Sequence, residues 1–163
     1  GSAISLTPGT LVAVEGFLLG DRITQYDTAG NVLDTLAVAP KTSHTGLASI
    51  GGELFLLNNT PGEISRVDPG TGALTTLVLT SGTGDLGRYG NQFMAVGTAP
   101  NTFVRFYDTA GTLQSSLWIS IANPGPGTRQ IHAIAGDVVG GRLFVGATDG
   151  GITVFDLAGN VLG

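Results

Sequence analysis

The chain has 163 residues, a formal net charge of −5, 42% hydrophobic and 12% charged residues, and no cysteine. The absence of cysteine excludes disulfides and thiolate metal sites. Seven Lys and Arg residues are too few for a patch that binds nucleic acid or an anionic membrane surface. No apolar stretch approaches the roughly 18 residues of a membrane span, so membrane insertion is not expected.

A short motif recurs four times along the chain. It consists of a β-branched residue, variable positions, an aromatic residue or Val, and then Asp followed by a glycine turn. Its copies occupy residues 23–27, 64–68, 104–108 and 152–156, and the spacings between their aspartates are 41, 40 and 48 residues. Regular recurrence at this period is the signature of a repeat architecture, so we predict four copies of one unit of roughly forty residues.

Each copy of the motif is accompanied by three further segments that we predict to be strands. An apolar strand precedes the motif, at residues 11–14, 54–57, 93–96 and 143–146. A strand of small residues lies further upstream, at residues 4–6, 47–49, 86–88 and 134–136. A fourth strand follows the glycine turn, at residues 31–38, 73–79, 112–119 and, in a short form, 160–162. Four strands joined by short turns predict an antiparallel meander.

The predicted fold is an all-β β-propeller of four four-stranded antiparallel blades, at about residues 3–40, 41–82, 83–122 and 129–163. The second strand of each unit is apolar throughout, so both of its faces must be covered by neighbouring sheets. This favours a propeller over a β-sandwich. Three arrangements stay open: a closed four-bladed ring, half of an eight-bladed ring closed by dimerisation, and a truncated or engineered section of a longer propeller.

Residues 46–72 and 134–159 resemble repeats of the NHL and SMP-30-like propeller superfamily. The shared pattern is an apolar-Ala strand, a turn with Gly, a second strand, and then I-x-x-[aromatic or V]-D-x-x-G. The resemblance implies a propeller, commonly of six blades, and a bacterial secreted or cell-surface protein. Lactonase-like members of the superfamily carry acidic and Asn metal ligands on their inner strands. Here the inner strands carry Ser5, Ser49, Arg88 and Asp137 instead.

The polar residues divide into turn residues and candidate ligand-binding residues. The four aspartates of the motif are predicted to cap β-turns, with Gly at the position that needs φ > 0. Glu15, Glu53 and Glu63 are expected to be exposed. Trp118 is expected to pack, with a contact surface as the alternative. The predicted ligand-binding cluster at the mouth of a central channel consists of His44, Asp85, Arg88, Arg129 and His132.

These features predict a non-catalytic binding or structural module that presents its loops to a sugar, peptide or protein partner. No catalytic residue, metal site or cofactor is predicted. One alternative is a self-assembling or engineered propeller fragment that forms homo-oligomers through open blade faces. The other is a propeller-type hydrolase or lactonase. An extracellular or cell-surface location is expected.

Overall fold

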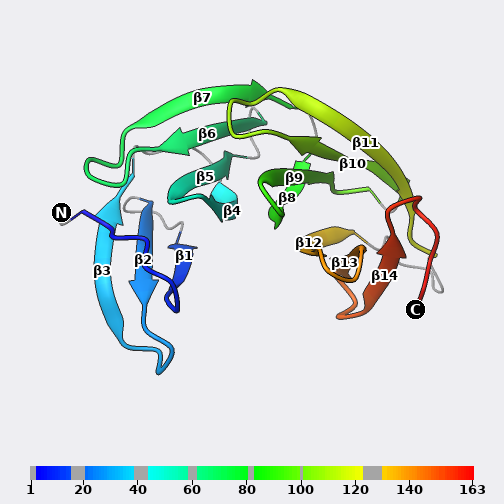
Figure 1. The fold of residues 1–163 in the computed structure, drawn as a ribbon, viewed down its shortest axis with the longest axis horizontal. Helices are drawn as coiled ribbons and strands as arrows, with labels where there is room; N and C mark the ends of the chain where they lie inside the picture. Colours follow the sequence, from blue (N-terminus) through cyan, green and yellow to red (C-terminus); the bar gives the residue numbers. More distant parts are fainter. Residues whose placement is uncertain are drawn as a thin grey trace. The chain divides into compact units, whose positions relative to one another are not determined.

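The computed structural model describes residues 3–15, 21–38, 44–58, 62–80, 83–99, 101–122 and 130–163. Within these residues the chain is all-β, with fourteen strands in four antiparallel sheets and no helix. No helix in this described part is therefore long and apolar enough to span a membrane. The chain divides into two compact units, Gly1–Thr80 and Ser81–Gly163, and each unit is described by itself (Figure 1).

The first unit contains two sheets. The first sheet has three strands in the order β1 (Leu11–Glu15), β2 (Arg22–Tyr26) and β3 (Val32–Ala37). The second sheet has four strands in the order β4 (His44–Ile50), β5 (Glu53–Asn58), β6 (Glu63–Val67) and β7 (Leu74–Leu79).

The second unit also contains two sheets. The third sheet has the strands β8 (Thr83–Tyr89), β9 (Gln92–Gly97), β10 (Asn101–Tyr107) and β11 (Leu113–Ser120). The fourth sheet has β12 (Ile131–Asp137), β13 (Arg142–Ala147) and β14 (Ile152–Asp156). In every sheet the strands pair in chain order, as a meander requires.

The expectation of four strands per sheet is correct for the second and third sheets and wrong for the first and fourth, which have three. Residues 4–6 form no strand because their backbone groups bond elsewhere: Ile4 N donates to Pro69 O, and Ser5 O accepts from the Gln25 side chain. Residues 160–162 form a single bridge between Phe155 and Val161. These two segments belong to the repeats of the first and fourth sheets.

The second strand of a sheet is buried on both faces in the second and third sheets, as its composition predicted. Leu54, Phe55, Leu56 and Leu57 in β5 are at most 1% exposed. In β9 the four residues from Phe93 to Val96 are at most 2% exposed. A strand with this pattern has apolar side chains above and below the sheet, so both sheet faces must be covered.

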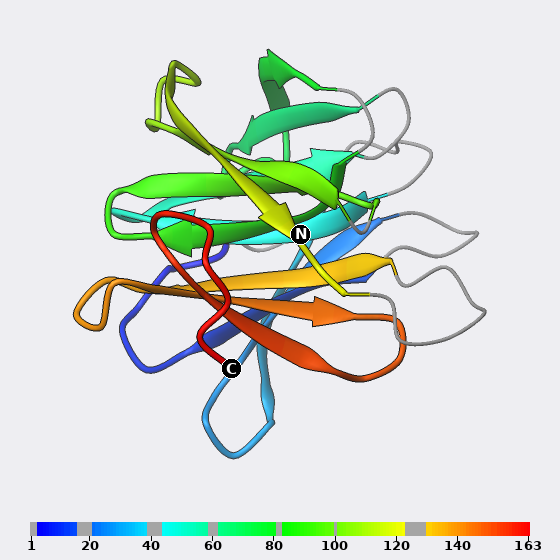
Figure 2. The same cartoon turned by 90° about the vertical axis from the view of Figure 1, so that its right-hand side faces the viewer.

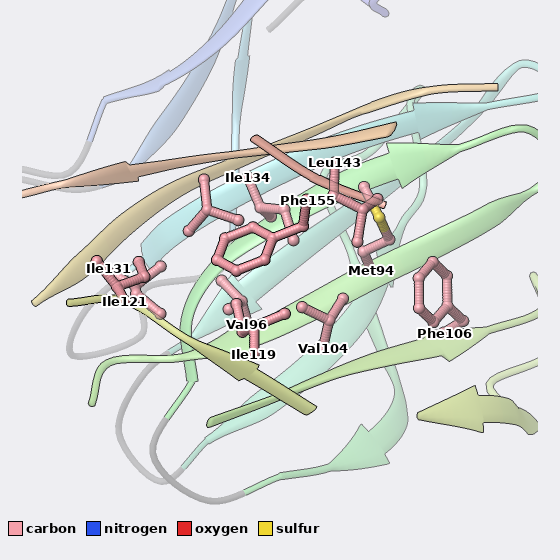
Figure 3. Close-up of a cluster of buried hydrophobic side chains, with 11 residues drawn as sticks. Met94, Val96, Val104, Phe106, Ile119, Ile121, Ile131, Ile134, Leu143 and Phe155 are labelled. Atoms are coloured by element: carbon pink, nitrogen blue, oxygen red, sulfur yellow. The ribbon is translucent and has the colours of Figure 1, made fainter. Parts of the chain in front are cut away.

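In each unit the two sheets meet through an apolar core. The core of the second unit joins side chains of the third sheet, such as Met94 and Val104, with side chains of the fourth, such as Leu143 and Phe155 (Figure 3). In the first unit, Ile23 and Leu36 of the first sheet share a cluster with Leu54, Leu56 and Val67 of the second. Burial of these side chains is the main stabilising contribution within each unit.

β8 and β12, the first strands of the third and fourth sheets, approach each other backbone to backbone. A Cβ atom at Gly84 would lie 2.6 Å from the carbonyl oxygen of Ile131, and one at Gly87 would clash with the carbonyl oxygen of Ile134. A Cβ atom at Gly136 would lie 2.8 Å from the carbonyl oxygen of Arg88. The small residues predicted for these strands are therefore needed where the third and fourth sheets converge.

A methyl group at Gly87 should destabilise the second unit. Because its neighbour would be a backbone carbonyl that cannot rotate away, we expect Gly87→Ala to lower the free energy of unfolding by about 1–3 kcal/mol. Gly163→Ala is the control, since nothing lies within 4 Å of a Cβ atom there. Urea unfolding curves compare the two variants with the parent chain; equal stability of the Gly87→Ala variant would contradict the close approach.

Candidate functional site

The two ends of each sheet differ in what they contain. With the strands numbered by their place in the four-strand repeat, the first-to-second and third-to-fourth connections lie at one end, which we call the turn end. In the first sheet, β1, β2 and β3 are the second, third and fourth strands of the repeat. The opposite end, which we call the loop end, holds the start of the first and third strands and the end of the second and fourth. The β8–β9 and β12–β13 turns, both at turn ends, lie on the same side of the second unit (Figure 2).

The turn end repeats the same chemistry in all four sheets. Oδ1 of Asp27 accepts hydrogen bonds from the backbone N–H groups of Ala29 and Asn31, at 2.9 and 2.8 Å. The equivalent bonds form at Asp108 and Asp156, and at Asp68 the donors are the N–H groups of Gly70 and Thr71. Gly30 follows in the left-handed region, at φ 86°. The predicted turn capping is confirmed, so these aspartates have a structural role.

The capping bonds lower the pKa of three of these carboxyl groups, those of Asp27, Asp68 and Asp156. Hydrogen bonds from Asn31, led by its side chain, hold the pKa of Asp27 below its ordinary value, and Asn160 does the same for Asp156. At Asp68 the backbone N–H groups of Gly70 and Thr71 lower the pKa. Each bond favours the ionised form, so the turns stay capped at neutral pH.

The loop end of the first sheet carries an exposed charged group. Arg22 Nε donates to Glu15 Oε2 at 2.6 Å, and the Tyr26 hydroxyl donates to Glu15 Oε1 at 2.7 Å. The Tyr26 bond, followed by that of Arg22, lowers the pKa of Glu15, while the bond to Glu15 raises the pKa of Tyr26. Because this group is exposed, it contributes little to stability and is available to a partner.

The loop end of the second sheet carries a buried polar row that spans the strand pairs His44–Asn58 and Asn58–Glu63. His44 Nε2 lies 2.9 Å from Asp21 Oδ2, and the His44 side chain is fully buried. Glu63 is 5% exposed and accepts hydrogen bonds from the hydroxyls of Ser65 and Thr76. The expectation that Glu63 is exposed is therefore wrong, because these two hydroxyls replace water around its carboxylate.

The third and fourth sheets are linked at the loop end by a buried carboxyl group. Asp85 Oδ2 accepts a hydrogen bond from the backbone N–H of Ile134 at 2.9 Å. Burial raises the pKa of Asp85 to about 6, although the bonds from Leu86 and Ile134 and the charge of nearby His132 act in the opposite direction. An acid with a pKa this close to neutral is a common mark of a functional site.

A β-bulge occurs at the same place in three inner strands. The pairing of β4, β8 and β12 skips one residue each, at Thr45, Gly84 and His132. In each case the extra residue lies two positions before the predicted strand of small residues, which begins at residue 47, 86 or 134. Bulges redirect side chains and are frequent beside binding sites, and His132 is exposed at its bulge.

The predicted cluster is brought together only in part. Asp85 and His132 lie close enough in the second unit to interact electrostatically. His44 belongs to the first unit, where it pairs with Asp21. Arg88 extends toward the turn end of β8, where its Nε donates to Gly90 O at 2.8 Å. Arg129 lies outside the described residues.

Sequence reasoning missed an exposed aromatic pair at the loop end of the third sheet. Phe103 and Trp118 are cross-strand neighbours whose ring centroids lie 5.0 Å apart in an edge-to-face arrangement. They are 43% and 51% exposed, so the alternative expectation of a contact surface describes Trp118 better than packing does. The alternation of β10 and β11 would have placed both rings on one face, had the register been known.

No metal centre is formed by the residues whose positions are described: none of their His, Asp and Glu side chains gather in a group of three or more suited to a metal ion. The ionisable groups instead form pairs, such as Asp21 with His44 and Glu15 with Arg22.

Comparison with known proteins gives a fold and no family. No protein-family model and no curated protein matches the chain. Among solved structures, a protein of unknown function from Bacteroides caccae is similar, with a TM-score of 0.61 at 11% sequence identity. The match covers 96% of this chain and 57% of that chain, so this chain spans little more than half of it. At this identity the likeness shows the fold alone.

Replacing Asp85 should change how stability depends on pH. The pKa in the folded chain, about 6, lies above the ordinary value of 3.8, so ionisation of Asp85 opposes folding. Its contribution is most favourable below about pH 4 and is lost as pH rises through 6, by on the order of 3 kcal/mol. Asp85→Asn keeps the acceptor for Ile134 N–H without the charge, so we expect it to be more stable than the parent at pH 7.5.

Urea unfolding at pH 4.5 and 7.5 measures this effect. Asp137→Asn is the matched control, because Asp137 caps the β12–β13 turn through its bond from Gly140 N. The control should keep the pH dependence of the parent chain. The same dependence in the Asp85→Asn variant would show that Asp85 does not carry it.

Proposed function

We propose that the chain is a non-catalytic binding scaffold of the β-propeller type, which presents the loop ends of its sheets to a partner. The observation that carries this proposal is the difference between the two sheet ends. The turn ends repeat one capped turn four times, whereas the loop ends carry unlike groups in each sheet. In repeat proteins the shared positions maintain the framework, and the positions that differ are available for recognition.

Several features of the sheets support a propeller. Consecutive sheets have the same strand order, both faces of β5 and β9 are buried, and β8 and β12 converge through glycines. Propeller blades require face-to-face packing of this kind, with small residues on the inner strands. Rigid sheets of this type commonly hold binding groups at one end, where the loops lie.

The buried position of His44 favours binding over the hydrolase or lactonase alternative. A hydrolytic site needs a base that reaches the substrate, and the His44 side chain is enclosed and paired with Asp21. His132 is exposed, and its charge acts on the carboxyl group of Asp85. Asp85 and His132 serve better as hydrogen-bonding groups for a ligand.

A sugar or peptide is the partner that the loop end of the third sheet fits best. The exposed rings of Phe103 and Trp118 offer apolar surface for a sugar ring or an apolar side chain. Asn101 and Ser120 lie beside them at the same end and are joined by a hydrogen bond of 2.6 Å. Aromatic rings flanked by amide and hydroxyl groups suit a neutral, polar ligand, which in turn suits an extracellular or cell-surface location.

The test is an array of glycans and peptides probed with the parent chain and with the double variant Phe103→Ser, Trp118→Ser. We expect the parent to bind a defined subset and the variant to bind it at least about tenfold more weakly. Val139→Ser is the matched control, because Val139 is a fully exposed apolar residue at a turn end. Equal loss in the control, or no change in the double variant, would remove this surface from the proposal.

A further inference from the structure

One apolar residue of the fourth sheet is exposed where its counterparts are fully buried. Ile152 begins the fourth copy of the repeated motif, as Ile23, Ile64 and Val104 begin the others. Those three residues are 0% exposed, and Ile152 is 67% exposed. The same position is thus filled with an aliphatic side chain in every repeat and left uncovered in one.

The first sheet shows the complementary exception. Leu11 begins the second strand of its repeat, as Leu54, Phe93 and Leu143 begin those of the others. These three counterparts are 0% exposed, and Leu11 is 64% exposed. Its neighbours Val12 and Val14 pack against the core of the first unit, so a core-facing side of the sheet exists and Leu11 lies on the other side.

Within each unit, the two kinds of position meet each other. Ile23 of the first sheet shares a core with Leu54 of the second, and Val104 of the third sheet shares a core with Leu143 of the fourth. In both units, the face that carries the first residue of the motif is therefore covered by the face of the next sheet that carries the first residue of the second strand. Ile152 occupies the first of these two repeat positions, and Leu11 occupies the second.

The face around Ile152 is apolar over several residues. Strand pairing places Ala135, Phe144 and Val154 in one row and Gly146 and Ile152 in another, while Leu143, Val145 and Phe155 belong to the opposite face and its core. Phe144 is 36% exposed. Such a face is an association surface in a soluble protein.

We propose that the Ile152 face of the fourth sheet packs against the Leu11 face of the first sheet in a second copy of the chain. In a dimer, the Ile152 face of each copy covers the Leu11 face of the other. The dimer therefore contains two such contacts and is closed by a two-fold axis. The Leu11 face also carries the Glu15–Arg22 pair, which this assembly would cover. The aromatic pair of Phe103 and Trp118 belongs to the third sheet, so binding there does not depend on the assembly.

Light scattering coupled to size exclusion tests the assembly. The expected mass is twice the 16.5 kDa of one chain. Ile152→Lys should raise the dimer Kd at least about a hundredfold, because an ammonium group replaces an apolar side chain in both contacts. Val139→Lys, which alters a fully exposed residue of the β12–β13 turn, should remain dimeric.

Mixing two variants tests which faces meet. Leu11→Glu should also be monomeric, yet an equimolar mixture with Ile152→Lys should recover a dimer, since the mixed pair has one contact without either change. Circular dichroism and the melting temperature establish that both variants are folded. A parent chain of 16.5 kDa at all concentrations, a dimeric Ile152→Lys variant, or a mixture that stays monomeric would each overturn the proposal.

Discussion

A sheet that is apolar on both faces is stable in water only when both faces are covered. This constraint governs the whole chain, because the repeated strands place aliphatic and aromatic side chains on both sides of each sheet. Leu54 and Phe55 are neighbours on β5, point to opposite faces, and are both 0% exposed. Packing of the third sheet on the fourth brings β8 and β12 close together, and at positions 84, 87 and 136 a side chain larger than glycine would meet the neighbouring backbone.

The two ends of the sheets differ in how their polar groups relate to the stability of the fold. At the turn ends, the aspartates and glycines serve the chain's own backbone, and their hydrogen bonds leave little to offer a ligand. At the loop ends, groups differ from sheet to sheet and some oppose stability, such as the buried carboxyl of Asp85. Local conflict with stability within an otherwise consistent fold is expected where a protein binds something.

The sequence was sufficient to predict the features that depend on neighbouring residues. The motif before each turn located the capping aspartates, and the apolar run at 93–96 located a strand buried on both faces. Contacts between side chains on different strands could not be predicted from the sequence. The pairing of His44 with Asp21, the burial of Glu63 and the aromatic pair of Phe103 and Trp118 all depend on register or on a second sheet. The missing first strand of the first sheet likewise depends on a long-range contact, because the backbone of Ile4 bonds to Pro69.

Solvent accessibility of isoleucine methyl groups in solution tests the central claim, that every apolar sheet face is covered. Methyl NMR with a soluble paramagnetic agent reports it residue by residue. If the Ile152 face is covered in the assembled protein, its δ1 methyl will be as protected as those of Ile23 and Ile64, which are 0% exposed in the single chain. Strong relaxation of the Ile152 methyl, comparable with that of the fully exposed Val139, would contradict the account.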